Sequence, residues 1–321
     1  MRRTLLAAVA LLVLAAAASW YAVRTYDMPG PLTAETAVDV PRGGLEIIAD
    51  ALQRQGVIGQ PLAFRAAALL TRGDGPLHAG ELEIPAGASL RQVLAVLRSA
   101  RAVQHHLTVP EGLTAAQVAV LVDRADAATG NAPLPDEGWF LPETYSYERG
   151  VSRQVLVERG RTAMERALDR IWVGRDPAVN LATSREALIL ASIVERETAR
   201  PEERPRVAAV FLNRLRLGMK LQSDPTVAYG ANGGLGVAEH PITRAELERD
   251  DPYNTYRIPG LPPGPICMPG AASLHAVTHP ARTNDLFFVA DGSGGHAFAR
   301  TLDEHGRNVV HWRQVERARA P

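Results

Sequence analysis

Two glutamates, Glu195 and Glu197, directly follow the most apolar turns of a predicted helix. The residues before them are Leu188, Ile189, Leu190, Ala191, Ile193 and Val194. A carboxyl held against apolar side chains loses the hydration of its charged form, so its pKa rises and it can act as a general acid near neutral pH. The pattern therefore indicates an acid–base catalyst.

The helix that carries both acids has predictable ends. Thr183 and Glu186 have the spacing of a capping box, and Pro201 should exclude the residue before it from the helix. Glu195 and Glu197 are turned about 200° apart, so only one of them can point into a given cleft. Glu197 is the preferred acid because it shares a stripe with Ile189, Leu190, Ile193 and Val194, and Glu195 is the second choice. The alternative is that both are surface acids paired with Arg196 and Arg200.

Residues 137–147, EGWFLPETYSY, place aromatic side chains beside carboxylates. Sugar rings stack on aromatic faces while their hydroxyls seek acceptors, so Glu137 and Tyr145 are candidate sugar-binding residues. The alternative is a hydrophobic plug in a loop.

A second helix is predicted over Arg204–Leu217, with Gly218 as its stop and Val207, Val210, Phe211 and Leu217 facing inward. The sequence LQSDPTVAYG that follows is expected to be rich in turns. It gathers many hydrogen-bonding side chains that could face a ligand, namely Gln222, Ser223, Asp224, Thr226 and Tyr229.

The proline-rich residues 252–270 should form a stiff loop without regular structure, which favours a groove wall carrying Asn254 and Tyr256. Strands are then expected over Leu286–Ala290 and Ala297–Arg300, joined by the turn DGSGGH. Because this turn joins two strands, it is a poor match to a phosphate-binding loop, and His296 is expected to line a cleft.

No metal or other cofactor is expected. His105 and His106 are neighbours on a predicted strand and would point to opposite faces. His275 and His279 lie four residues apart on a predicted helix but lack the adjacent glutamate of the HExxH motif. Cys267 is the only cysteine, which excludes an intrachain disulfide and a zinc site built on cysteine pairs.

The chain has 321 residues, 46% of them hydrophobic, which is enough for two domains. Its 35 basic and 35 acidic residues balance, so nothing favours nucleic acid as a partner. At the N-terminus, Arg2 and Arg3 precede an apolar run from Leu5 to Val23 that is about long enough to cross a bilayer. A retained anchor is favoured over a signal peptide cleaved near Ala15–Ala18.

After a linker, the sequence predicts a small α/β unit with strands over Ala37–Val40 and Gly80–Ile84. Its helices are expected over Leu45–Gln55, Pro61–Leu70 and Ser89–Ser99. A strand over His105–Val109 and the turn VPEGLT mark a boundary. We therefore predict an α+β protein with a cytoplasmic stub and transmembrane anchor (1–27), a linker and small subdomain (28–104) and a mixed α+β catalytic domain (105–321).

Several long motifs resemble the endolytic murein transglycosylase family of bacteria, also called MltG or YceG-like. These motifs are SIVERET, FLNRLRLGMKLQSDPTVAYG, YNTYRIPGLPPGPI, PGAASLHAVTHPA and LFFVADGSGGHAF, together with EGWFLPETY and VPEGLT. The resemblance implies a single-pass inner-membrane protein with a LysM-like subdomain and a periplasmic catalytic domain. It also implies that the protein cleaves nascent peptidoglycan strands, ends their elongation and accompanies cell-wall synthases of elongation or division.

Glu197-Thr198 is similar to the Glu-Ser pair that ends the catalytic helix of other lytic transglycosylases. By this resemblance, Glu197 would protonate the bond between MurNAc and GlcNAc and then deprotonate the MurNAc 6-hydroxyl, leaving a 1,6-anhydro end. The sugar would be oriented by Gln222, Asp224, Tyr229, Asn254 and His296. Three alternatives stay open: a muramidase that uses water, with Glu143 or Asp224 as second carboxylate, a non-catalytic peptidoglycan-binding scaffold, and a metallohydrolase, which chelators would inhibit.

Overall fold

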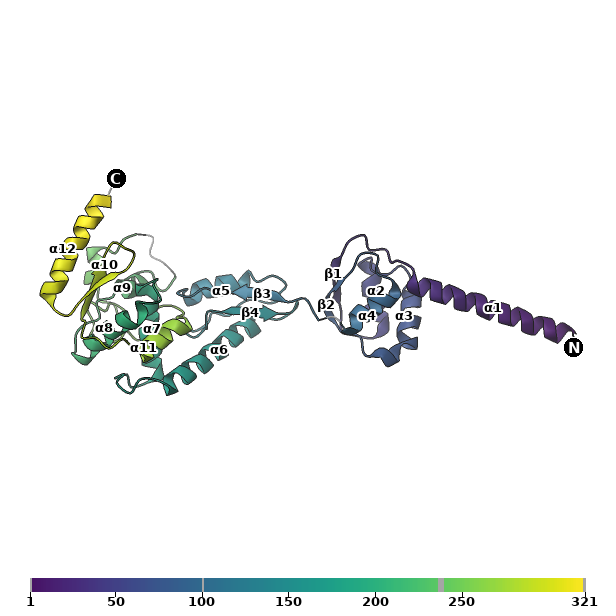
Figure 1. Ribbon diagram of the computed structural model, residues 1–321, viewed down its shortest axis with the longest axis horizontal. Coiled ribbons are helices and arrows are strands. Elements are labelled where there is room, and N and C mark those ends of the chain that lie inside the picture. The colour runs from purple at the N-terminus through teal and green to yellow at the C-terminus, as the bar shows by residue number, and fades with distance from the viewer. Residues whose placement is uncertain (1, 100, 236–239, 320–321) are drawn as a thin grey trace. The chain divides into compact units, whose positions relative to one another are not determined.

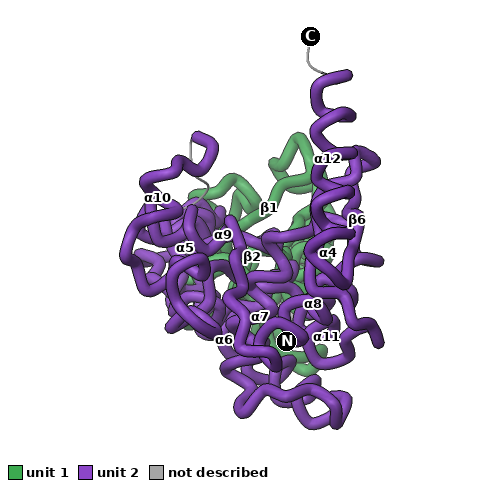
Figure 2. Tube along the Cα trace, turned by 90° about the vertical axis from the view of Figure 1, so that its left-hand side faces the viewer, with its two compact units in different colours: residues 1–105, 146–150 green, residues 106–145, 151–321 purple. Residues whose placement is uncertain are grey.

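The computed structural model describes residues 2–99, 101–235 and 240–319. The chain folds as two compact units (Figures 1 and 2). Unit 1 comprises residues 1–105 and 146–150, and unit 2 comprises residues 106–145 and 151–321. The return of residues 146–150 to unit 1 has no counterpart in the expected order of domains. Both units contain helices and strands, which confirms the predicted mixed α+β composition.

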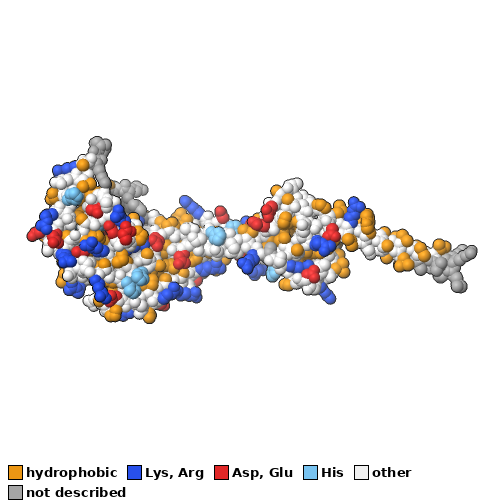
Figure 3. All heavy atoms as spheres, viewed as in Figure 1, with side chains coloured by type: hydrophobic (Ala, Val, Ile, Leu, Met, Phe, Trp, Pro, Cys, Tyr) orange, Lys and Arg blue, Asp and Glu red, His pale blue; other side chains and the backbone are white. Residues whose placement is uncertain are grey.

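Helix α1 (Arg2–Asp27) opens unit 1. Its side chains Leu11, Leu12 and Leu14 are exposed, and Figure 3 shows hydrophobic side chains along the helix. Among the described residues, Val9–Asp27 is the one stretch long and apolar enough to cross a membrane, and a signal sequence would share these properties.

The rest of unit 1 is built on the antiparallel pair of β1 (Thr36–Val40) and β2 (Gly80–Ile84). Helices α2 (Leu45–Arg54), α3 (Pro61–Leu70) and α4 (Leu90–Ser99) pack with this pair, and a 3-10 turn, η1, covers Arg72–Asp74. All five elements expected here are confirmed within a residue at each end. Their apolar positions form one core, which includes Val38, Leu52, Phe64, Leu82, Ile84 and Leu94.

Unit 2 is organised around α7 (Ser184–Glu197). Helices α6 (Arg153–Val173), α8 (Arg204–Arg216), α9 (Asp224–Ala231) and α11 (Ala271–Thr278) pack against it. The remaining elements of unit 2 are α5 (Ala115–Asp123), α10 (Arg244–Glu248), α12 (Leu302–Arg319) and the hairpin of β5 (Phe287–Ala290) and β6 (His296–Ala299). The paired strands β3 (His105–Thr108) and β4 (Thr144–Tyr147) belong partly to each unit, because His105 and residues 146–147 count with unit 1.

Helix α7 forms where the cap and the apolar run predicted it. Thr183 Oγ1 accepts the N–H of Glu186 at 3.2 Å, and every residue from Ala187 to Val194 is buried. Truncating one of these leucines, such as Leu188, would cost about 2–5 kcal/mol of stability. The helix ends at Glu197, earlier than Pro201 alone requires, because Thr198 is already extended.

Two expectations about neighbouring segments were wrong. Residues 222–229 are not mainly turns, because α9 begins at Asp224 with Pro225 in its first turn, where the missing proline N–H costs nothing. Leu217 does not face inward but is 52% exposed, since α8 has already ended at Arg216. Gly218 follows with φ of 68° and stops the helix as expected.

Candidate active site

Glu197 is the last residue of α7, and its carboxyl faces the start of α9. Its Oε1 atom accepts a short hydrogen bond from the hydroxyl of Ser223, the N-cap residue of α9. Burial raises the pKa of Glu197 to about 7, the Ser223 hydrogen bond opposes this rise, and the charge of Asp224 adds to it. Glu197 is therefore poised to give and take a proton at neutral pH.

Asp224 and Tyr256 form a hydrogen-bonded pair beside this carboxyl. The Tyr256 hydroxyl donates to Asp224 Oδ1 at 2.6 Å. Burial raises the pKa of Tyr256, and the hydrogen bond to Asp224 raises it further, so the phenol stays protonated and keeps donating. The pair holds an acidic oxygen close enough to Glu197 for the two charges to interact.

Asn254, predicted to contact a ligand, is buried and fixes the loop that carries Tyr256. Its side-chain amide donates to the carbonyls of Glu246, Leu247 and Arg249 at 3.2, 3.0 and 2.8 Å. Its Oδ1 atom accepts the N–H of Tyr256 at 3.0 Å. Asn254 therefore positions the backbone of Tyr256.

Gln222 and Thr226 fix the segment that carries Ser223. Gln222 has φ of 52°, a left-handed conformation that costs a non-glycine residue about 1 kcal/mol or more, and its N–H donates to the Thr255 carbonyl at 3.2 Å. The Thr226 hydroxyl donates to the Ser223 carbonyl at 2.7 Å and lies 2.9 Å from Thr255 Oγ1. Ser223 is thus held on both sides, which aims its hydroxyl at Glu197.

Arg214 is a buried cation near the site that the sequence did not single out. Its Nε donates to the Leu286 carbonyl at 2.7 Å and its Nη1 to the Leu221 carbonyl at 2.6 Å. Burial lowers the pKa of Arg214, while the charges of Tyr256 and Glu197 act to raise it. The sequence did hold a signal for Arg214, because it follows Val207 by seven residues and therefore lies on the inward side of α8.

Glu195 occupies a different environment. Its Oε1 atom accepts from Arg204 Nη2 at 2.8 Å and its Oε2 atom from the Gly270 N–H at 3.0 Å. The Glu195 and Arg204 side chains are only 5% and 9% exposed, and Glu111 also accepts from Arg204 at 3.1 Å. Burial raises the pKa of Glu195, and the Gly270 hydrogen bond opposes the rise. This carboxyl is bound into a buried ion pair.

The alternative of surface acids paired with Arg196 and Arg200 is wrong. Arg196 donates to the Gly112 carbonyl at 3.3 Å, and Arg200 donates to the Ser293 carbonyl at 2.7 Å.

His296 reaches the end of α7 through a residue that the sequence did not single out, Glu203. Glu203 accepts from the His296 backbone N–H at 2.9 Å, and its Oε2 atom lies 2.6 Å from His296 Nδ1. The Thr198 hydroxyl donates to the same carboxylate at 3.3 Å. Burial acts to raise the pKa of Glu203, but the His296 hydrogen bonds outweigh it and the pKa is lowered. Glu203 therefore links the β5–β6 hairpin to the residue after Glu197.

Glu137 and Tyr229 form a second group further along α9. The Glu137 carboxylate accepts the Ala115 N–H at 3.0 Å and the Tyr229 hydroxyl at 3.1 Å, and burial raises its pKa. The centroids of the Tyr229 and Tyr253 rings lie 4.8 Å apart. These aromatic faces and the acid are the combination that suits a sugar.

Tyr145 and the histidine pair have contacts of their own. The Tyr145 hydroxyl donates to the Leu141 carbonyl at 2.5 Å, and its ring packs edge-on against Phe140. His275 and His279 stack with their ring centroids 4.3 Å apart.

The arrangement defines a site of the acid–base type, in which one buried carboxyl titrates near neutrality beside a second carboxylate. A model of the YceG-like family matches residues 38–311, and the chain belongs to this family. The resemblance seen in the sequence motifs is thereby confirmed.

The curated relatives described here are both named endolytic murein transglycosylase. The chain is 28% identical over 303 residues to the endolytic murein transglycosylase of Bacillus subtilis strain 168, covering 84% of this chain and 82% of the relative. It is 28% identical over 320 residues to the endolytic murein transglycosylase of Streptococcus pneumoniae R6, where it spans 85% of itself but only 57% of the relative.

A solved structure is also similar. A putative YceG-like protein from Listeria monocytogenes aligns with a TM-score of 0.53 and 26% identity, covering 86% of this chain and 99% of the other.

Proposed function

We propose that this protein is an endolytic lytic transglycosylase that cleaves peptidoglycan strands with Glu197 as acid and then base. The names of the Bacillus and Streptococcus relatives support the reaction class. The observation that carries the assignment of Glu197 is its carboxyl at the end of a buried helix, bonded to Ser223 and titrating near 7. Glu195 is instead a positioning residue, because Arg204 and Gly270 occupy its oxygens.

In the proposed reaction, protonated Glu197 gives its proton to the glycosidic oxygen between MurNAc and GlcNAc. The bond from that oxygen to C1 of MurNAc breaks through an oxocarbenium-like state, which the negative charge of Asp224 stabilises. The Glu197 carboxylate then takes the proton of the MurNAc 6-hydroxyl while the oxygen of that hydroxyl attacks C1. One strand ends in 1,6-anhydro-MurNAc, the other begins with a free GlcNAc hydroxyl, and no water or cofactor enters.

We assign contact with the glycan to Asp224, Tyr256, Glu137, Tyr229 and His296. The contacts of Tyr229 on α9 with the Glu137 carboxylate and the Tyr253 ring support this assignment. Three other predicted substrate-binding residues instead hold Ser223 and Tyr256 in place. They are Gln222, Thr226 and Asn254. Tyr145 stays a predicted contact.

We further propose that α1 is a retained membrane anchor, that the remainder of unit 1 is LysM-like, and that unit 2 works in the periplasm beside cell-wall synthases. The length and apolar surface of α1 support the anchor. The compact β1–β2 core of unit 1 supports a separate binding subdomain.

The test uses the chain without residues 1–27, with Glu197→Gln and Glu195→Gln as variants, on uncrosslinked glycan strands. Mass spectrometry should find internal fragments with anhydro-MurNAc ends, lost in Glu197→Gln. Reducing ends would favour the second candidate, a muramidase, and the charge of Asp224 acting on Glu197 supports Asp224 as its second carboxylate. Intact strands that remain bound to the protein would indicate a scaffold.

A further inference from the structure

Helix α3 is apolar on two opposite sides. Phe64 and Ala68 face the core of unit 1, whereas Leu62, Leu69 and Leu70 are 75%, 57% and 86% exposed. Positions 62, 69 and 70 lie seven and eight residues apart and therefore share one side of the helix. An exposed leucine face on a short helix marks a surface that contacts something other than water.

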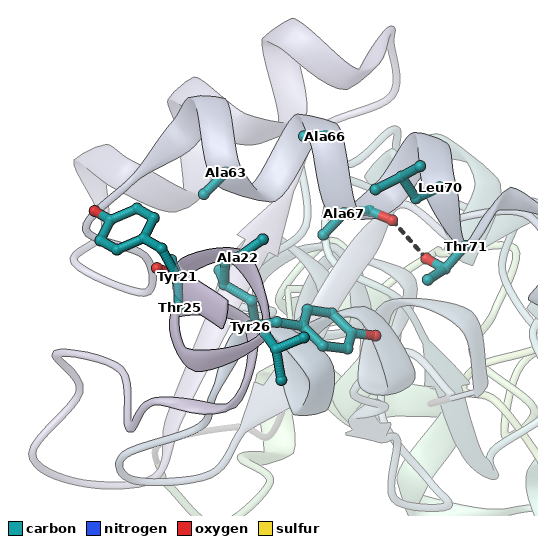
Figure 4. A pocket seen from close by; sticks show the side chains of 11 residues that line it. Tyr21, Ala22, Thr25, Tyr26, Ala63, Ala66, Ala67, Leu70 and Thr71 are labelled. Carbon is teal, nitrogen blue, oxygen red and sulfur yellow. Dashed lines mark hydrogen bonds between the residues drawn. The ribbon is translucent and has the colours of Figure 1, made fainter. Parts of the chain in front are cut away.

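The exposed face of α3 adjoins the end of α1. A pocket between the two helices is lined by Tyr21, Ala22, Thr25 and Tyr26 of α1 and by Ala63, Ala66, Ala67 and Leu70 of α3 (Figure 4). The end of α1 is fixed on α4 as well, because Arg91 Nε lies 2.6 Å from Asp27 Oδ1 and its guanidinium stacks over the Tyr26 ring. The α3 face therefore continues the surface of α1.

The depth of this contact follows from α1. Trp20 and Tyr21 are exposed near the end of the apolar stretch, where aromatic side chains mark the membrane–water interface, and Arg24 lies over the Trp20 ring. The turns from Tyr21 to Tyr26 rise about 8 Å, within the interfacial layer of a bilayer. A helix packed on these turns lies at the same depth.

We propose that α3 is a membrane-docking helix whose leucines Leu62, Leu69 and Leu70 insert into the leaflet at the C-terminal end of α1. This inference rests on the proposed anchor function of α1. An amphipathic helix in the interface buries its apolar face about 5–10 Å into the headgroup and acyl boundary, which matches leucines beside the last turns of a spanning helix. Unit 1 then holds the membrane by two contacts.

The test places the full-length protein in vesicles of phosphatidylethanolamine and phosphatidylglycerol. Single cysteines replace Leu69, Leu70, Leu14 on α1 and the exposed Glu83 on β2, and each is labelled with a polarity-sensitive fluorophore. The native Cys267 is buried and stays unlabelled. We expect lipid-borne quenchers to quench the probes at 69, 70 and 14 several-fold more than the probe at 83.

A second variant tests the leucine face itself. Leu69→Glu combined with Leu70→Glu should expose a probe at position 62 to water, whereas Leu134→Glu, at an exposed leucine of unit 2, should leave it quenched by lipid. If the probe at 14 is in lipid while those at 69 and 70 are in water, the docking of α3 is refuted, whereas the proposed anchor function of α1 is retained. If the probe at 14 is also in water, the anchor and the docking helix are both refuted.

Discussion

The replacement Glu197→Gln should abolish cleavage, and the stability of unit 2 relative to the wild type should increase as the pH rises past neutrality. Burial raises the pKa of Glu197 from its ordinary value of 4.5 to about 7. At 1.36 kcal/mol for each pKa unit, this corresponds to about 3 kcal/mol of preference for the protonated carboxyl in the folded state.

The sign follows from which state binds the proton more tightly. Since the folded state does, the contribution of Glu197 to stability is fully present below pH 4.5 and is lost as the pH rises through about 7. Glutamine cannot ionise, so it does not suffer this loss. The free energy of unfolding of Glu197→Gln, minus that of the wild type, should therefore rise by up to about 3 kcal/mol across this interval.

Urea unfolding followed by tryptophan fluorescence measures this difference. In the chain without residues 1–27, all tryptophans belong to unit 2, namely Trp139, Trp172 and Trp312. The control is Glu202→Gln, whose side chain in the wild type is 69% exposed in the connection between α7 and α8, and it should change little with pH. If the free energy of unfolding of Glu197→Gln, minus that of the wild type, is the same below pH 4.5 and above pH 7, the reasoning is refuted.

Three further substitutions test the neighbours of Glu197 and the core. Ser223→Ala removes a hydrogen bond that lowers the pKa of Glu197, so the alkaline limb of the pH–rate profile should move to higher pH, and an unmoved limb would speak against this contact. Glu195→Gln weakens the buried ion pair with Arg204 and should cost about 3 kcal/mol in urea unfolding, with activity lost only as folded protein is lost. Gly160→Ala puts a methyl group against the buried Phe140 ring and should lower thermal stability by about 1–3 kcal/mol, so an unchanged melting temperature would contradict the tight packing.

The local parts of this fold could be predicted from the sequence. Helix α7 combines a threonine cap with a continuous apolar stripe, and both signals lie within the helix itself. The elements of unit 1 follow in the same way from short periodic segments. The preference for Glu197 over Glu195 follows from its place on the apolar stripe and from the resemblance of Glu197-Thr198 to the Glu-Ser pair, and the two carboxyls do have different partners.

The partners of these carboxyls could not be predicted, because tertiary packing brings them from distant segments. Ser223 lies 26 residues after Glu197, and Gly270 lies 75 residues after Glu195. Asn254 has the side chain of a ligand-binding residue, but the backbone carbonyls around it exist only in the folded loop. Glu203 likewise gains its role only when the β5–β6 hairpin places His296 beside it.

Glu197 should drive cleavage without the entry of water. The most direct measurement is to cleave uncrosslinked glycan strands with the chain without residues 1–27 in water enriched in oxygen-18. Mass spectrometry then gives the masses of the fragments with new MurNAc ends. We expect anhydro ends that carry no oxygen-18 and that disappear with Glu197→Gln. Reducing ends that carry the label, or anhydro ends that persist in Glu197→Gln, would contradict this expectation.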